Sequence, residues 1–214
     1  MSSNYALRVL IAALIITLAA AACQAPSQQK SRSAPSPSLP APPVSTQPEG
    51  PPPSDNVSWA ADGVITAGEY RNSRSFDGYD LWWTADDTYI YVGIKAKTQG
   101  WAAVGFGPES MMKGADIVIA YVKDGKLTIS DQYSTGQFGP HAPDIEQGGT
   151  DDILASGGKS DGVFTTIEFK RKLDTGDRFD KPLRQGTNKI IWAYGSEPQF
   201  TLKHTARGSS EIDL

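Results

Sequence analysis

Residues 88–96 read TYIYVGIKA, and this stretch decides the fold. Ile90, Val92, Ile94 and Ala96 alternate with polar or small residues, so they share one face of an extended chain. A period of two is the pattern of a half-buried β-strand. We therefore predict that this segment is a strand with one face in a hydrophobic core.

Other segments extend this pattern along the chain. Residues 163–171, VFTTIEFKR, alternate so that Val163, Ile167 and Phe169 are expected to face inward and Glu168 and Lys170 outward. Segments 101–107, 116–122 and 189–195 are apolar without alternation, which predicts strands covered on both faces.

Turn signals separate these segments, with Asp-Gly or Gly-Gly pairs at residues 62–63, 77–78, 124–125, 148–149, 157–158 and 161–162. No long amphipathic helix is recognisable, although residues 171–180 are compatible with a short turn of helix. Many short strands between such turns predict an all-β, antiparallel β-sandwich of the immunoglobulin type for residues 55–214.

The first 54 residues have a different composition. An apolar run of 14 residues from Val9 ends at Cys23, and it is too short for a typical membrane-spanning helix. We interpret residues 1–22 as a signal peptide. Three alanines precede Cys23 and resemble a bacterial lipobox, although the usual leucine three residues before the cysteine is absent. Cys23 is therefore the expected lipid attachment point; simple cleavage and retention as an anchor are the alternatives.

Residues 23–54 hold ten of the 15 prolines and no aromatic residue. Such a Pro/Ser-rich segment lacks the apolar surface needed to fold, which predicts a disordered linker. With the lipid on Cys23, the domain would be a membrane-anchored lipoprotein outside the cytoplasm, at the cell surface or in the periplasm.

The charge and the cysteine count exclude several function classes. After Arg8, Lys30, Arg32 and Glu49 are set aside, 17 basic and 23 acidic residues remain in the domain. No basic stripe is visible, so we expect no nucleic-acid partner. A single cysteine excludes an intramolecular disulfide and a covalent C-x-x-C-H haem attachment. No catalytic constellation is recognisable, and we expect no autonomous enzyme.

Several motifs resemble the DOMON domain family. They are GWAAVGFG (100–107), MKGADIVIAYV (112–122), DGKLTISDQYS (124–134), DGVFTTIEFKRKLDTGD (161–177) and IIWAYGSEPQFTLKHTARGSSEIDL (190–214). The resemblance implies an immunoglobulin-like β-sandwich. Some members of this family bind b-type haem through one methionine and one histidine and transfer electrons. Others bind no haem and are associated with sugars or serve as accessory domains.

The resemblance places Met112, in MKG, and His204, in LKHTARG, at the positions of the two haem ligands. A thioether and a neutral imidazole together favour low-spin iron and electron transfer, here with an unknown redox partner protein. Lys203, Arg207 and Lys113 are the candidate cations for the haem propionates. The adjacent Met111 is expected to face away from the slot.

The remaining alternatives are these. A lone buried methionine more often packs than ligates. His141 is expected to be a loop residue. The pairs Asp86–Asp87 and Asp151–Asp152 are interpreted as turns rather than Ca²⁺ sites, and Asp116 as a hydrogen-bonding residue at the start of a strand. The five tryptophans keep a carbohydrate- or ligand-binding module without haem open as an alternative function.

Overall fold

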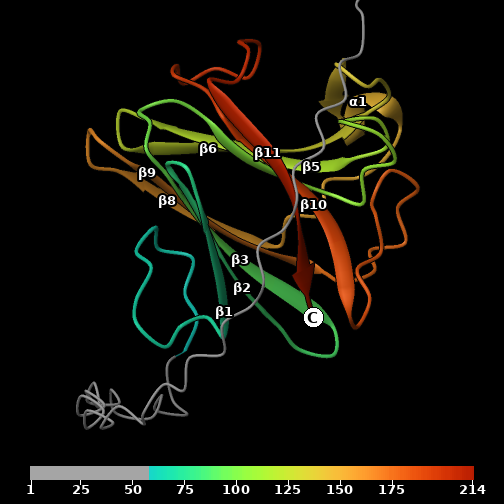
Figure 1. Cartoon of the computed structure of the whole chain (residues 1–214), viewed down its shortest axis with the longest axis horizontal. Coiled ribbons are helices and arrows are strands. Elements are labelled where there is room, and N and C mark those ends of the chain that lie inside the picture. The colour runs from blue at the N-terminus through green and yellow to red at the C-terminus, as the bar shows by residue number, and fades with distance from the viewer. Residues whose placement is uncertain (1–57) are drawn as a thin grey trace, which may run out of the picture. The chain divides into compact units, whose positions relative to one another are not determined.

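The computed structural model describes residues 58–214, which form two packed antiparallel sheets (Figure 1). The predicted signal peptide, the lipid site at Cys23 and the Pro/Ser linker lie outside the described residues. No helix within 58–214 has the length and apolarity needed to span a membrane.

The first sheet contains five strands in the order β1-β2-β3-β9-β8. Their bounds are β1 Asn72–Phe76, β2 Tyr79–Ala85, β3 Tyr89–Ala96, β8 Ala155–Ser160 and β9 Thr165–Lys172. The second sheet contains six strands in the order β11-β10-β4-β5-β6-β7. Their bounds are β4 Ala102–Phe106, β5 Asp116–Lys123, β6 Lys126–Ser134, β7 His141–Pro143, β10 Thr187–Tyr194 and β11 Ala206–Asp213. The predicted antiparallel β-sandwich is confirmed.

The main core lies between the two sheets. Alternate residues of β3 enter it, and Ile90, Val92, Ile94 and Ala96 are all buried, as their spacing predicts. From the six-stranded sheet, Val104, Val118, Ile190 and Trp192 are among the residues of the same cluster. The alternation of the sequence therefore fixes which face of each strand packs inward.

Residues 171–180, whose sequence is compatible with a short turn of helix, contain none; the short helix α1 lies at Asp144–Gln147. The prediction of an inward Val163 is wrong, because this residue is exposed and precedes β9. Glu168 lies on the outer side of β9, as predicted, but it is fully buried there.

Glu168 is buried because the segment before β1 covers it. Its Oε2 accepts hydrogen bonds from the backbone N–H groups of Asp62, Gly63 and Val64, and its Oε1 accepts one from the Tyr70 hydroxyl. These four donors compensate for the loss of water around the carboxyl group. Glu168 occupies a position that the sequence pattern assigns to solvent. It instead holds residues 58–71 against the five-stranded sheet.

Candidate functional site

A second apolar cluster lies on the outer face of the six-stranded sheet. Its buried members are Trp101, Ala103, Ala115, Ile117 and Ile119, and its half-buried members are Met112, Tyr121, Ile191, Ala193 and Phe200. The outer face of an antiparallel sheet is usually polar because it meets water. An apolar outer face therefore indicates that loops, a ligand or a partner cover it.

Strand register makes this cluster continuous. Ala103 of β4 pairs with Ile119 of β5 on one side and with Ala193 of β10 on the other. The neighbouring residues Val104, Val118 and Trp192 point to the opposite face and belong to the main core. The three central strands are thus apolar on both faces, as the unbroken hydrophobic runs predict.

Met111 and Met112 form the tip of a tight turn after β4. Lys113 N–H donates to the Ser110 carbonyl at 2.9 Å, so the two methionines are the central residues of the turn. Met111 has a φ of 57° and is 50% exposed, whereas Met112 is half-buried and packs on the second cluster. The segment is a turn rather than extended chain. The two side chains still lie in different environments, with Met111 exposed to solvent and Met112 on the second cluster.

Gly114 ends this turn with a φ of 73°, which glycine adopts without steric cost. Its N–H donates to the Ser134 carbonyl of β6 at 2.8 Å. Met112 also donates its N–H to the Gln137 carbonyl at 3.2 Å. The methionine is therefore held on a loop that two other segments fix in place.

The second loop over this face runs from residue 195 to residue 205 and carries His204. Its Phe200 ring lies 4.9 Å from the Tyr121 ring of β5, which places the loop against the second cluster. Thr205 N–H donates to the Tyr194 carbonyl at 2.7 Å and returns the chain to the sheet. Burial and the adjacent Arg207 charge lower the pKa of His204, so its imidazole is neutral at pH 7.

The predicted cations lie on the two loops and at the start of β11, which carries Arg207. The Arg207 guanidinium lies beside His204, with Nη1 3.0 Å from Nε2, so Arg207 donates to an unprotonated Nε2. Lys203 is exposed on the same loop. Lys113 stands on the methionine loop, where Glu109 pairs with it at 3.6 Å.

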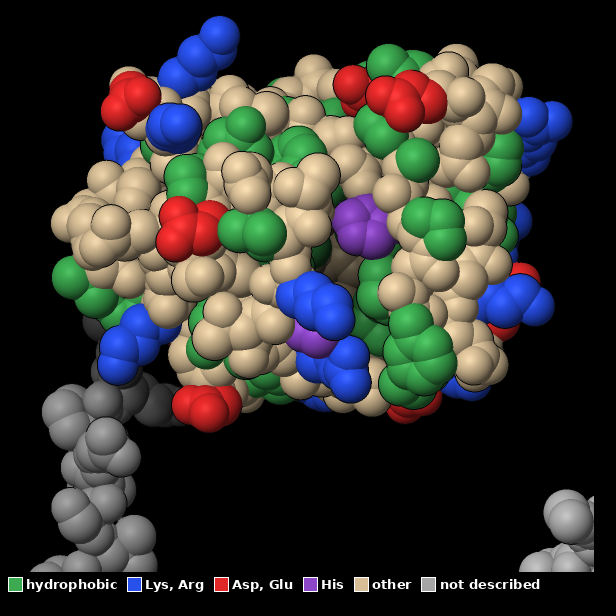
Figure 2. All heavy atoms as spheres, turned by 90° about the horizontal axis from the view of Figure 1, so that it is seen from above, with side chains coloured by type: hydrophobic (Ala, Val, Ile, Leu, Met, Phe, Trp, Pro, Cys, Tyr) green, Lys and Arg blue, Asp and Glu red, His purple; other side chains and the backbone are tan. Residues whose placement is uncertain are grey.

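Figure 2 shows this side of the molecule, which carries a hollow with hydrophobic side chains in it. Histidine lies at its edge, and lysine and arginine side chains gather close by. Neutral imidazole, thioether and cationic groups are therefore available around one apolar surface.

His141 lies in the short strand β7 rather than in a loop. Its Nδ1 lies 2.5 Å from Gln132 Oε1, which can only accept a hydrogen bond, so the proton of the neutral ring is on Nδ1. Burial lowers the pKa of His141. His141 is therefore a second neutral imidazole with an unprotonated Nε2.

The other sequence predictions concern acidic pairs and tryptophans. Asp86 accepts backbone hydrogen bonds from Thr88 and Tyr89, and Asp151 accepts one from Ile153, as turn residues do. The tryptophans form no exposed platform in the described part of the chain. Trp83, Trp101 and Trp192 are buried, and Trp59 and Trp82 are half-buried.

Comparisons with known proteins agree with this description. The profile of the DOMON domain matches residues 77–195. MOXD1 homolog 1 of Drosophila melanogaster is 33% identical over 117 residues, which are 53% of this chain and 16% of that protein. DBH-like monooxygenase protein 1 of Homo sapiens is 29% identical over 139 residues, which are 64% of this chain and 22% of that protein. The chain thus spans less than a quarter of the length of either relative.

Two solved structures are similar at lower identity. The cytochrome b domain of pyranose dehydrogenase from Coprinopsis cinerea has a TM-score of 0.49 and 17% identity over 64% of this chain and 77% of that one. The cytochrome domain of cellobiose dehydrogenase from Myriococcum thermophilum has a TM-score of 0.46 and 15% identity over 64% of this chain and 74% of that one.

Proposed function

This chain belongs to the DOMON domain family, and we propose that its β-sandwich binds b-type haem and relays single electrons. The observation that carries the proposal is the second apolar cluster, on which Met112 packs from one loop while a second loop brings His204. These two residues stand at the motif positions of the haem ligands in haem-binding members of the family.

The residues of this surface fit a haem group. A porphyrin needs an apolar surface, and the cluster presents one outside the main core. The indole N–H of Trp101, itself a buried member of the cluster, has no hydrogen-bond partner among residues 58–214, so this surface holds one unsatisfied donor. Met112 supplies a thioether, a known axial ligand of haem iron.

His204 is the proposed second ligand, because its imidazole is neutral and lies on the second loop over this face. Arg207 now donates to His204 Nε2, so ligation through that atom requires Arg207 to move away. The released guanidinium and Lys203 are then free to bind propionate groups. Lys113 is a weaker candidate, since Glu109 already pairs with it.

When bound, the haem supplies a one-electron couple between ferric and ferrous iron. The chain holds the group, excludes water from one of its faces and neutralises its propionates. If Met112 and His204 both held the iron, no position would be left for a substrate. The module therefore serves a redox partner protein rather than carrying out catalysis on its own.

We further propose that the module works outside the cytoplasm and is held at a membrane through Cys23. The support is the apolar run before Cys23 and the proline-rich composition of residues 24–54. Mass spectrometry of the mature N-terminus tests this proposal. An unmodified peptide that runs through Cys23 would overturn it.

Haem titration of the purified full chain tests the main proposal. We expect saturable binding at one haem per chain, with a sharp Soret band. His204→Ala should weaken retention strongly, whereas His141→Ala should leave it intact. The opposite result would assign the ligand role to His141. A protein that stays colourless and is retarded in polysaccharide gels would instead favour the carbohydrate-binding alternative.

A further inference from the structure

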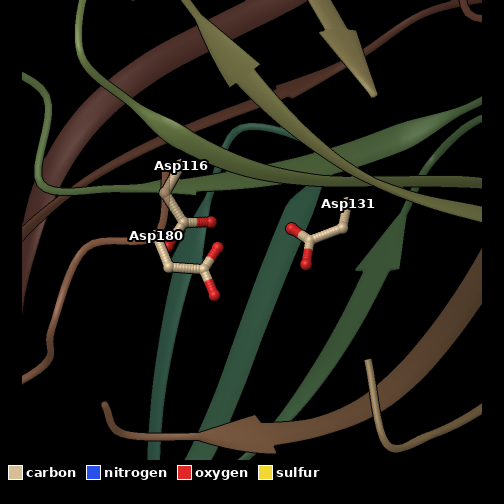
Figure 3. Close-up of side chains that lie close together, drawn as sticks. All are labelled: Asp116, Asp131 and Asp180. Atoms are coloured by element: carbon tan, nitrogen blue, oxygen red, sulfur yellow. The ribbon is translucent and has the colours of Figure 1, made fainter. Parts of the chain in front are cut away.

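Three aspartates meet on the inner side of the six-stranded sheet, away from the second cluster (Figure 3). Asp116 is the first residue of β5, Asp131 lies in β6, and Asp180 lies in the segment between β9 and β10. One carboxylate oxygen of each lies within 4.8 Å of the others. Their relative exposures are 0%, 3% and 5%, and Figure 3 shows the three carboxyl groups turned toward one another.

The cluster has one buried cation. The Arg171 guanidinium pairs closely with Asp116 Oδ2, and its Nη1 lies 3.9 Å from Asp180 Oδ1. Two backbone N–H groups also contribute: that of Lys181 donates to Asp116 at 2.9 Å, and that of Asp152 donates to Asp131 at 3.0 Å. One guanidinium does not balance three carboxylates.

Several oxygens of the cluster remain without a partner. Asp116 Oδ1 and Asp131 Oδ1 are buried and receive no hydrogen bond from any of residues 58–214. The Thr175 hydroxyl approaches the Asp180 carboxyl, but neither oxygen of that group receives a well-formed hydrogen bond. Asp144, the first residue of α1, is fully buried nearby, and both of its oxygens also lack a partner.

Protonation alone does not resolve this arrangement. Burial and the neighbouring carboxylates raise the pKa of Asp131 to about 8, of Asp144 to about 7 and of Asp180 to about 6. A proton shared between two neighbouring carboxyl groups satisfies only the two oxygens that it joins, and six buried oxygens of Asp116, Asp131, Asp144 and Asp180 have no donor among residues 58–214. A bound cation would compensate the charge and engage the oxygens at the same time.

We propose that Asp116, Asp131 and Asp180 bind a Ca²⁺ ion, with Asp144 as the adjacent fourth carboxylate. All available donors are oxygen atoms, which hard divalent cations prefer. Two opposite ligands of Ca²⁺ lie about 4.8 Å apart, since each Ca–O distance is about 2.4 Å. Mg²⁺ demands a stricter octahedron and retains several waters, which a buried and irregular set of carboxylates does not favour.

The ion would connect three segments that are distant in sequence. It would join the start of β5, the end of β6 and the loop before β10, and Asp116 stands four residues after Met112. Ca²⁺ would therefore stabilise the base of the loop that carries Met112. The site shares none of its carboxylates with the proposed haem surface, so it stands independently of haem binding.

Direct binding to the EDTA-treated full chain tests the proposal. Tb³⁺ is the probe, because aromatic side chains sensitise its luminescence and Tyr133 lies two residues from Asp131. We expect saturable luminescence that Ca²⁺ displaces and an equal concentration of Mg²⁺ does not. At about a hundredfold excess of Ca²⁺ over its dissociation constant, the midpoint of thermal unfolding should rise by about 5–10 °C.

Two variants locate the site. Asp180→Asn should abolish Ca²⁺-displaceable luminescence, whereas Asp87→Asn, an exposed turn residue, should behave as wild type. Near-UV circular dichroism checks that each variant is folded. The proposal is overturned if wild type shows neither saturable binding nor a Ca²⁺-dependent thermal shift. It is equally overturned if folded Asp180→Asn binds as tightly as wild type. Should Asp180→Asn not fold, the wild-type thermal shift decides alone.

Discussion

Met111 holds a left-handed backbone conformation, with φ of 57°, at the tip of the loop that carries Met112. For a residue with a Cβ atom this conformation costs about 1–2 kcal/mol, and its side chain is half exposed and contributes little packing. Met111→Gly should therefore raise the free energy of unfolding by about 1 kcal/mol, as measured by urea titration. Met111→Ala keeps the strain and is the matched control; equal stability of the two variants would contradict this account.

Arg171 and Arg184 form ion pairs in opposite environments. Arg171 and Asp116 are fully buried, whereas Arg184 and Asp174 are 69% and 49% exposed at 3.1 Å. Removing one partner of a buried pair leaves an uncompensated charge and costs about 3–5 kcal/mol. An exposed pair contributes about 0–1 kcal/mol because water screens it.

Arg171→Met should therefore lower the free energy of unfolding several times more than Arg184→Met. Chemical denaturation of both variants in a calcium-free buffer measures the difference. Similar small losses in both would mean that the buried carboxylates are already neutral without Arg171.

At the scale of elements, Glu168 of β9 ties the segment before β1 to the sheet. Glu168→Ala removes an acceptor of three backbone N–H groups. Those of Asp62 and Val64 have a second acceptor, so the buried Gly63 N–H is the donor left unsatisfied, at a cost of about 1–3 kcal/mol. We expect faster hydrogen exchange at the amides of residues 62–64, with the core strands little changed. Lys170→Ala changes the next residue on the same face of β9 and is the control; equal exchange in both variants would argue against this role.

The strands themselves were largely predictable from the sequence. β3 alternates strictly, and β5 is apolar from Ile117 to Val122, so both the sandwich and its doubly buried strands follow from the hydrophobic pattern. The burial of Glu168 did not follow, because its partners lie about a hundred residues earlier and only tertiary contact brings them together. Residues 171–180, which were compatible with a short turn of helix, instead bring Asp180 and the following Lys181 N–H to the buried aspartates.

At the scale of the whole molecule, the two proposed sites lie on opposite faces of the six-stranded sheet. Its outer face presents the second cluster with Met112, and its inner side holds the aspartates. The family motifs pointed to Met112 and His204, whereas nothing in the local sequence linked Asp116, Asp131 and Asp180. Their spacing of 15 and 49 residues matches no metal-loop pattern, so only the fold reveals the cluster.

The spin state of the haem in two methionine variants tests the central claim most directly. Met112 packs on the second cluster and Met111 faces solvent, so only Met112 is placed to ligate a haem there. Absorption spectra of the haem-loaded full chain should be low-spin, with split α and β bands after reduction, in wild type and Met111→Ala. Met112→Ala should give a high-spin spectrum. The account is contradicted if Met112→Ala stays low-spin, if Met111→Ala alone turns high-spin, or if no haem binds.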